Sequence, residues 1–473
     1  MATGLMERLL PRRVVVEILG RSTRATFRRD GTHRLRSRGA PDAMRYTSPM
    51  LTIHVRGTAA YDRALGTLAH RGDADLARVE PEVRAILEAV RTRGDAAVHE
   101  LTERFEQRHA SPLVWDRDRI EEGARAFSPE GTRMLEAAAE RIRRYHEKQL
   151  DRGFRYEEDG VLLGQRVRPA KAAGVYAPGG KARYPSSVLM TAVPAVVAGV
   201  PRVVLATPRP TPEILAAARI AGVHELLDAG GAQAIGALAY GTESLARVDK
   251  IVGPGNLYVA CAKRLVFGIV DIDGIAGPSE ILVVADDEAD SRVVAADLLS
   301  QAEHDEDAYA LLVTLSEAKA REVAAEVERQ LAVLPRRAVA EASVRDHGCC
   351  FVAGDLAEAG RVADLLAAEH LSLQVRDPEA LLEGIGAAGA AFLGDHTPEA
   401  AGDYAAGPSH VLPTGGAARF SSPLGVYDFV VRTSLIRYSR EAIARQTELL
   451  AGLARMEGLE AHARAVEIRR EAR

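Results

Sequence analysis

The octapeptide SQAEHDED, from Ser300 to Asp307, places two potential metal ligands three residues apart at the end of an apolar, alanine-rich segment. Residues three apart on a helix share a face, so the amide oxygen of Gln301 and the imidazole of His304 can converge on one point. Zinc prefers nitrogen and sulphur ligands with some carboxylate, and a neutral amide oxygen is an uncommon ligand. The spacing therefore permits half of a metal site, and it equally fits the polar end of a helix before an acidic turn.

The second half of the chain carries further side chains that could complete such a site. They are His370 in AAEHLSLQV, Asp403 and His410 in AGDYAAGPSH, and Glu457 and His462 in RMEGLEAH. By spacing alone, the last two fit an exposed helix as well as a site. The sequence thus offers more candidate ligands than a core needs, without showing which of them meet.

Glu369 and His370 are adjacent and directly precede the alternating run LSLQV. Neighbours in an extended segment point to opposite faces, so the two side chains could serve different steps at one site. Histidine, with an ordinary pKa of about 6.5, is the natural proton acceptor at neutral pH, and a carboxylate can activate water. Two surface residues at the start of a strand would give the same pattern. Ser279, in AGPSEILVV, is by position alone a capping or turn serine.

Three glycine-bearing loops follow β-rich runs: VYAPGGKARYPSS, DAGGAQAIGALAYGT and VGPGNLYVACAKRLV. In the last, residues 253–256 stand between a strand and a helix, where free N–H groups and the helix dipole favour an anion such as phosphate. Neither GxGxxG nor GxxxxGK[ST] occurs, and an ordinary tight turn fits each loop taken singly. Three such loops at the carboxyl ends of strands favour a ligand crevice, because open α/β sheets bind ligands there.

Alternating helices and strands must position these residues. Over residues 79–150 the apolar positions recur at helical spacing, with one face formed by Val83, Ile86, Leu87 and Val90. Further along, short β-rich runs alternate with alanine-rich helices; the predicted strands are AGVYAP, RVVLATP, VDKIVGPG, EILVVADD, YALLVTL, CCFVAG, LSLQV and AAFLGD. This alternation predicts βαβ units, and hence an α/β fold with two doubly wound parallel sheets.

Two segments near the C-terminus stand apart from this pattern. The loop from Ala405 to Gly425 is long for a compact domain, and long loops of this kind are usually functional or linkers. The chain closes with two helical segments separated near Gly458. We therefore expect the tail to be a small separate module or an arm on a partner.

Composition narrows the class of protein. A chain of 473 residues with 47% hydrophobic side chains can form two or more cores, which predicts a multidomain globular protein. Its longest apolar runs fall short of the about 18–20 residues that a membrane span needs. Three cysteines without CxxC spacing argue against a disulfide framework or a thiolate metal site, and they favour a reducing cytoplasm.

Residues 1–49 contain 11 Arg, no Lys and four acidic residues, a net charge of +7 in a chain whose net charge is −5. This composition fits an organellar transit peptide, a basic tail, or a start assigned upstream of Met44 or Met50. The segment lacks a clear amphipathic period and ordinary domain patterning begins only after Met50, which favours the misassigned start. The acidic remainder offers no basic stripe, so we expect no nucleic acid partner.

Taken together, six collinear motifs resemble the histidinol dehydrogenase family over residues 60–470. IDGIAGPSEILVVAD is similar to the signature of that family, and it is accompanied in the family's order by VGPGNLYVACAKR, LLSQAEHD, AAEHLSLQV, GDYAAGPSHVLPT and EGLEAH. One departure is Ser409, which replaces the asparagine that often precedes the loop histidine.

The resemblance implies functional residues at positions that match the family's motifs. The implied zinc ligands are Gln301, His304, Asp403 and His462. The implied substrate contacts are these four residues together with Ser279, His370, His410 and Glu457. The implied NAD contacts are Tyr176, Gln233 and Asn256, and the implied catalytic residues are Glu369 and His370.

The implied reaction is the four-electron oxidation of L-histidinol to L-histidine through L-histidinaldehyde, with two NAD⁺, at the end of histidine biosynthesis. On the family mechanism one zinc ion per subunit acts as a template for the substrate, His370 takes the hydroxyl proton, and Glu369 activates water. A zinc-dependent hydrolase using the same cluster is the main alternative. A catalytically silent binding module would require lost chemistry, whereas every motif position holds a competent residue.

The implied fold has two Rossmann-like domains and small terminal modules in an intertwined homodimer, with His462 supplied by the partner's arm. The expected boundaries are 1–49 for the Arg-rich extension, 50–72 for an N-terminal module, 73–172 with 280–424 for the first Rossmann-like domain and most of the zinc site, 173–279 for the second domain with the NAD contacts, and 425–473 for a dimerisation arm. We expect a cytoplasmic enzyme with a small-molecule substrate and no membrane association.

Overall fold

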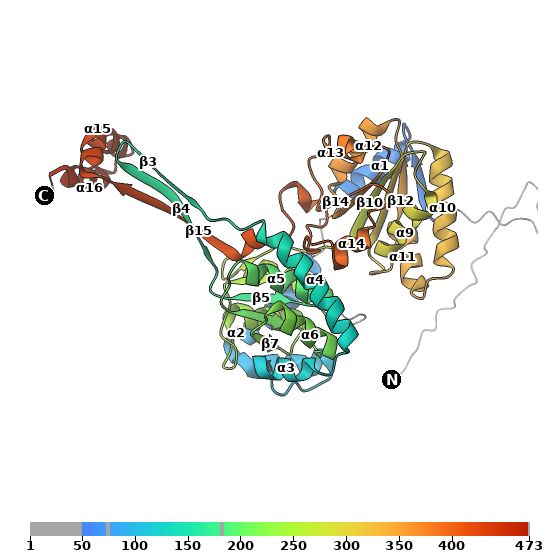
Figure 1. Cartoon of the computed structure of the whole chain (residues 1–473), viewed down its shortest axis with the longest axis horizontal. Coiled ribbons are helices and arrows are strands. Elements are labelled where there is room, and N and C mark those ends of the chain that lie inside the picture. The colour runs from blue at the N-terminus through green and yellow to red at the C-terminus, as the bar shows by residue number, and fades with distance from the viewer. Residues whose placement is uncertain (1–49, 72–75, 180–183, 472–473) are drawn as a thin grey trace, which may run out of the picture. The chain divides into compact units, whose positions relative to one another are not determined.

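The computed structural model describes residues 50–71, 76–179 and 184–471 (Figure 1). The expectation for the Arg-rich extension, residues 1–49, lies outside the described residues. Among the helices that are described, none combines the length and the apolar character needed to cross a membrane.

The first sheet has six parallel strands in the order β1-β12-β11-β10-β13-β14. The strands are β1 (Thr52–Val55), β10 (Glu280–Ala285), β11 (Tyr309–Thr314), β12 (Cys349–Val352), β13 (His370–Gln374) and β14 (Ala390–Leu393). Alternate residues of β10 enter different cores: Ile281 and Val283 face one side, Leu282 and Val284 the other. Burial on both faces explains why these strands read as continuous apolar runs.

Helices cover both faces of the first sheet (Figure 1). One face packs against α9 (Ser291–Ala302), α10 (Glu317–Leu331) and α11 (Arg337–His347). The other packs against α1 (Ala59–Ala69), α12 (Leu356–Leu366) and α13 (Pro378–Leu382). The short helix α14 (Glu399–Tyr404) follows β14 and packs on α9.

The second sheet also has six strands, in the order β2-β7-β6-β5-β8-β9. They are β2 (Val114–Trp115), β5 (Ala173–Tyr176), β6 (Val203–Ala206), β7 (Glu225–Leu227), β8 (Lys250–Val252) and β9 (Asp271–Ile272). All neighbours pair in parallel except β2, which joins the edge antiparallel to β7. The prediction of an α/β fold with parallel sheets is therefore confirmed, with one antiparallel edge strand that the sequence did not reveal.

Two groups of helices cover the second sheet. One face packs against α2 (Leu76–Glu106), α7 (Gly231–Tyr240) and α8 (Leu257–Val266). The other packs against α3 (Arg117–Ala124), α4 (Pro129–Glu147), α5 (Pro185–Val197) and α6 (Pro212–Ala221). The predicted apolar face of α2 is confirmed by the burial of Val83, Ile86, Leu87 and Val90.

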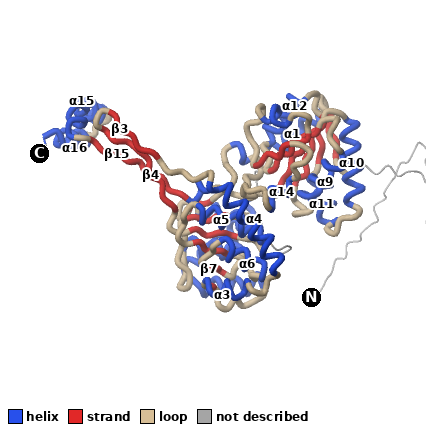
Figure 2. Tube along the Cα trace, viewed as in Figure 1, coloured by secondary structure: helices blue, strands red, loops and turns tan. Residues whose placement is uncertain are grey.

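A three-stranded antiparallel ribbon makes up the third sheet (Figure 2). It consists of β3 (Phe154–Glu158), β4 (Val161–Pro169) and β15 (Val430–Tyr438). Two 3₁₀ turns, Ala417–Arg419 and Val426–Phe429, precede β15, and the helices α15 (Arg440–Met456) and α16 (Glu460–Glu471) follow it. Gly458 separates these helices with a φ of +74°, which confirms the predicted break.

The packing corrects the expected domain boundaries in three places. Residues 50–72 do not form a separate module, because β1 and α1 belong to the first sheet and its cores. Helices α2 to α4 pack on the second sheet and not on the first. The ribbon joins residues 154–169 to the C-terminal segment, so the arm contains more than residues 425–473.

Geometry gives the reason for the second correction. Six strands span about 24 Å, and two helices side by side cover about 20 Å. Residues 173–279 supply only two helices to each face of the second sheet. The helices that precede β5 in the sequence complete the cover.

Candidate active site

The candidate residues of the first sheet gather at the amino ends of its strands. Ser279 and Glu280 lie at the start of β10, and Glu369 and His370 lie at the start of the neighbouring strand β13. A helix that connects two parallel strands returns the chain to their amino ends, so α9 ends on this same edge and brings Gln301 and His304 with it. The site therefore uses the edge opposite to the one at which open α/β sheets usually bind ligands.

His370 is held in one orientation by its neighbour strand. Its side chain is 5% exposed, and Nδ1 lies 3.0 Å from the carbonyl oxygen of Glu280. Because a carbonyl oxygen only accepts, Nδ1 donates in this bond and Nε2 keeps its lone pair. Burial lowers the pKa of His370 to about 4. The imidazole is therefore neutral at pH 7, and Nε2 is free to accept a proton.

Glu369 is fixed by the same residue. Its Oε2 accepts a hydrogen bond of 2.9 Å from the backbone N–H of Glu280. Burial raises the pKa of Glu369 well above its ordinary value. Its Oε2 lies 3.6 Å from His370 Nδ1, which is longer than a hydrogen bond. The two side chains therefore lie close together without a hydrogen bond between them.

A buried ion pair anchors Glu280. Its carboxylate pairs with the guanidinium of Arg71, and it accepts a hydrogen bond from the backbone N–H of Gly415. Gly415 belongs to the long loop of residues 405–425, so that loop is tied to the start of β10. Because these contacts fix the side chain of Glu280, its backbone can hold Glu369 and His370 in place.

Asp403, on α14, lies between two histidines. Its Oδ2 is 3.7 Å from His304 Nε2, and its Oδ1 is 3.7 Å from His410 Nδ1. His410 Nδ1 also lies 3.0 Å from the carbonyl oxygen of Asp403, and its Nε2 lies 3.2 Å from the hydroxyl of Ser187 on α5. Burial lowers the pKa of His410. The structure thus brings together three of the predicted site residues.

The donors around Asp403 fit a zinc ion. Two ligands about 2.1 Å from one ion lie about 3.4 Å apart at a tetrahedral angle, and the 3.7 Å between His304 Nε2 and Asp403 Oδ2 is close to this. Gln301 is 1% exposed, yet none of the described residues donates a hydrogen bond to its Oε1. A buried amide oxygen without a donor is unfavourable, and a cation would satisfy it. Amide oxygen, imidazole and carboxylate together suit zinc.

The two candidate residues near the C-terminus, Glu457 and His462, do not join the cluster around Asp403. Glu457 follows α15 and His462 lies on α16, and both are exposed. In the described part of the chain, neither makes a recorded hydrogen bond or ion pair with Gln301, His304 or Asp403. One chain by itself therefore presents three of the four predicted zinc ligands.

The sequence did not single out Glu399, the first residue of α14. Its side chain is fully buried, and its Oε2 accepts a hydrogen bond of 2.9 Å from Ser300 Oγ. Its Oε1 lies 3.5 Å from His370 Nε2. Burial raises the pKa of Glu399 to about 8. Because Glu399 and Asp403 are four residues apart in HTPEAAGDY, their shared helix face could have been inferred from spacing.

The glycine loops meet at the carboxyl edge of the second sheet. Tyr176 ends β5 and its Oη accepts a hydrogen bond of 3.1 Å from the backbone N–H of Gly231, at the start of α7. Gly253 follows β8, and a Cβ at this position would lie 2.2 Å from the carbonyl oxygen of Tyr176. After β5 the chain continues to β6 on one side of the sheet, and after β8 it continues to β9 on the other side. Ligands of open α/β sheets bind at such a switch point.

The remaining predicted NAD residues flank this edge. Gln233 is buried on α7, and Asn256 caps α8 by accepting hydrogen bonds from the backbone N–H groups of Tyr258 and Val259. Lys263 braces the loop, because its Nζ donates to the carbonyl oxygen of Gly253 at 2.9 Å and pairs with Asp273 at 2.5 Å. Internal contacts thus fix the geometry of this loop.

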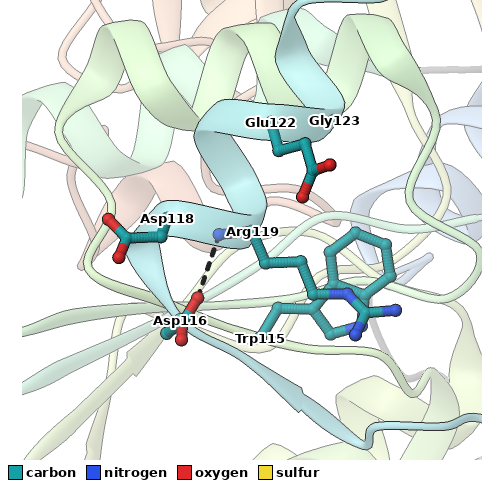
Figure 3. Close-up of a pocket in the computed structure, with 6 residues that line it drawn as sticks. All are labelled: Trp115, Asp116, Asp118, Arg119, Glu122 and Gly123. Atoms are coloured by element: carbon teal, nitrogen blue, oxygen red, sulfur yellow. Dashed lines mark hydrogen bonds between the residues drawn. The ribbon is translucent and has the colours of Figure 1, made fainter.

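A separate surface depression lies beside α3 and is lined by Trp115, Asp116, Asp118, Arg119, Glu122 and Gly123 (Figure 3). The guanidinium of Arg119 stacks 4.4 Å over the ring of Trp115, and Asp116 accepts a hydrogen bond of 2.9 Å from the backbone N–H of Arg119. None of the lining residues is a predicted site residue. The depression plays no part in the site described above.

Comparison with known proteins agrees with the family that the motifs indicate. Residues 69–470 match the family model described as histidinol dehydrogenase. The chain is 52% identical over 405 residues to the histidinol dehydrogenase of Aquifex aeolicus, covering 85% of this chain and 95% of that protein. It is 52% identical over 404 residues to that of Bacillus subtilis, covering 84% and 94%. The crystal structure of histidinol dehydrogenase from Elizabethkingia anophelis matches with a TM-score of 0.84 at 33% identity, covering 90% of this chain and 99% of that one.

Proposed function

The chain belongs to the histidinol dehydrogenase family, and we propose that it oxidises L-histidinol to L-histidine through L-histidinaldehyde with two NAD⁺. The observation that carries this proposal is the buried pair Glu369 and His370, held by the backbone of Glu280 close to the candidate metal ligand Asp403. A proton acceptor and a water-activating carboxylate at one site are what an alcohol oxidation followed by an aldehyde oxidation requires.

Gln301, His304, Asp403 and His462 would hold one zinc ion per subunit. When bound, zinc supplies a fixed charge that orients the substrate's nitrogen atoms and polarises the reacting group. The unpartnered Oε1 of Gln301 and the approach of His304 to Asp403 support this ligand set.

On this proposal, the partner subunit of a homodimer supplies His462. The ribbon and tail expose apolar side chains that a second chain could cover, among them Phe154 at 57%, Ile436 at 68% and Met456 at 84%. Exposed apolar surface on such a scale marks protein–protein contacts. His462 and Glu457 lie on this same tail, so covering it would also bring them to another subunit's site.

In the first step His370 Nε2 accepts the hydroxyl proton of the alcohol. Its Nδ1–H bond to the carbonyl oxygen of Glu280 keeps the ring in place while the imidazolium forms. A bound NAD⁺ would supply the hydride acceptor for both oxidations. The crevice at Tyr176, Gln233 and Asn256 is its proposed site. Ser279, His410 and Glu457 are proposed contacts to the substrate.

In the second step Glu369 removes a proton from water, which adds to the aldehyde to give the hydrate. A carboxylate whose pKa is raised by burial is a stronger base than an exposed one, so the burial of Glu369 suits this role. Once His370 has released the proton of the first step to water, it accepts a hydroxyl proton of the hydrate. Both residues are nearly sealed from solvent, which keeps the reactive aldehyde bound between the steps.

The stoichiometry of NADH tests the proposal. Two NADH formed per histidinol consumed, with loss of turnover after removal of metal by a chelator and recovery with zinc, would support both the reaction and the metal. A zinc-loaded protein that forms no NADH from histidinol and NAD⁺ would reject the dehydrogenase and favour a hydrolase.

The three cysteines are buried and unpaired, which supports the expectation of a reducing cytoplasm.

A further inference from the structure

The strand that carries the proposed base is polar on one of its two faces. Leu371 and Leu373 of β13 enter the apolar core under α12. Successive side chains of a strand point to opposite faces, so His370, Ser372 and Gln374 share the other face. All three are buried, and α9 covers them. The contact between β13 and α9 is therefore built from polar side chains.

Asp297 of α9 is the partner of these side chains. It is 6% exposed, and its Oδ2 accepts a hydrogen bond of 2.8 Å from Gln374 Nε2 and a longer one of 3.4 Å from Ser372 Oγ. Burial raises the pKa of Asp297 to about 6, against the opposing effect of these two hydrogen bonds, so the carboxyl is mainly ionised at pH 7. A buried carboxylate is unfavourable unless donors surround it. Asp297 therefore ties α9 to one position along β13.

The same two elements carry residues of the candidate active site. Gln301 follows Asp297 by four residues on α9, so the two share a helix face, and His304 comes just after the end of this helix. On β13, His370 precedes Ser372 by two residues on the same strand face. A shift of α9 along β13 would consequently move Gln301 and His304 relative to His370.

We propose that Asp297 is a positioning residue, which locks α9 to β13 and so sets the candidate zinc ligands Gln301 and His304 relative to His370. This inference rests on the proposed function, because it concerns the same site. Asp297 acts through its contacts to Gln374 and Ser372 and not on the substrate itself. Residues that orient metal ligands from behind change metal affinity or activity about 10- to 100-fold when they are replaced.

The test is a double-mutant cycle on the zinc affinity of the full-length protein. Asp297→Ala removes the acceptor, and Gln374→Met removes the main donor with little change in size. Each should weaken zinc binding about 10- to 100-fold in a titration of the metal-free protein against a competing chelator. The double variant should bind zinc no more weakly than Asp297→Ala alone, because both changes break one contact. At saturating zinc, Asp297→Ala should have a lower turnover number for histidinol and an unchanged KM for NAD⁺.

Thr314→Val is the matched control for the loss of a buried polar group. Thr314 ends β11 in the same sheet, is fully buried, and donates a hydrogen bond of 3.1 Å to the carbonyl oxygen of Ser316. Both Thr314→Val and Asp297→Ala should lose free energy of unfolding in denaturant. Only Asp297→Ala should lose zinc affinity.

Equal weakening of zinc binding in Thr314→Val and Asp297→Ala would overturn the inference, because it would indicate a general loosening of the sheet. Additive effects in the double variant, or a Gln374→Met protein with the zinc affinity of the wild type, would also overturn it, since Asp297 would then not act through β13. If the wild type binds no zinc or forms no NADH from histidinol, the proposed function itself fails. If it does both and Asp297→Ala binds zinc equally tightly, only the role of Asp297 fails.

Discussion

His370 and Glu369 depend on a single neighbouring residue for their positions. The backbone of Glu280 accepts from His370 Nδ1 and donates to Glu369 Oε2, and its side chain is clamped by Arg71. Because these contacts are buried and involve charged groups, small displacements at the start of β10 alter both side chains at once. At the scale of the residue, the backbone of Glu280 orients the side chains of both Glu369 and His370.

Replacing the proposed base tests this arrangement. His370→Asn removes the proton acceptor but keeps a side chain that can donate to the carbonyl oxygen of Glu280. The turnover number for histidinol should fall about 10²- to 10⁴-fold, the usual contribution of general acid–base catalysis. Histidinol binding, measured by calorimetry, should remain within a few-fold of the wild type. A turnover number near that of the wild type would rule out His370 as the base.

The loop after β8 holds its shape through a glycine that no other residue can replace. Gly253 has a φ of +117°, and a Cβ there would lie 2.2 Å from the carbonyl oxygen of Tyr176. Lys263 and Asp273 hold the two main-chain groups of this glycine from the other side. The loop after β8 therefore places its backbone against β5, at the edge where the NAD⁺ site is proposed.

Gly253→Ala should displace this loop, because a strained backbone conformation of this kind costs about 1–3 kcal/mol in a residue with a side chain. The KM for NAD⁺ should rise at least about tenfold, while histidinol binding measured without NAD⁺ should stay unchanged. Gly452→Ala, in α15 with open space around it, is the control and should leave the KM for NAD⁺ unaltered. An unchanged KM in Gly253→Ala would place the cofactor elsewhere.

A buried histidine makes the stability of α4 depend on pH. His146 is fully buried, and burial lowers its pKa from the ordinary value of 6.5. Below pH 6.5 the unfolded chain binds a proton at this residue that the folded chain does not, so the free energy of unfolding should fall as the pH decreases from 6.5. The loss is at most about 1.4 kcal/mol per pH unit for one group.

Denaturant unfolding of the wild type and His146→Leu between pH 7 and pH 5 checks this effect. The wild type should lose more unfolding free energy across this range than the variant, whatever their difference at pH 7. His396→Leu removes an exposed histidine and should keep the wild-type dependence. Parallel curves for the wild type and His146→Leu would show that His146 is not the source.

For the molecule as a whole, a complete zinc site requires a second chain on our proposal. Gln301, His304 and Asp403 come from the body of the molecule, and His462 comes from the exposed tail. Two inactive variants should then complement each other. In a mixture of Gln301→Ala and His462→Ala, half of the dimers are mixed, and each mixed dimer has one intact site.

Subunit exchange between these variants should restore about a quarter of the wild-type activity. The measurement is NADH formation after the two proteins are unfolded and refolded together, with each variant refolded alone as the control. Activity that stays at the level of the separate variants would show that all four ligands come from one chain, or that His462 is not a ligand.

The sequence by itself determined eight strands of the two parallel sheets, the helical face of α2 and the break at Gly458, because each of these depends on local periodicity or on one glycine. It also indicated the residue types at the site, since Gln301, His304, Glu369, His370 and Asp403 stand in motifs with fixed spacing. Local patterns are visible in a chain whenever the physical cause lies within a few residues.

Only the tertiary structure decided which residues meet. The helices α2 to α4 cover the second sheet, and the ribbon joins residues 154–169 to the C-terminal segment; neither pairing has a local signal. Glu399 became a site residue only when α14 packed on α9 and turned its carboxyl toward His370. Burial shifts the pKa values of Glu369 and His370 and leaves Oε1 of Gln301 without a donor among the described residues. Burial arises from packing between segments that are distant in the sequence. No short stretch of sequence therefore contains it.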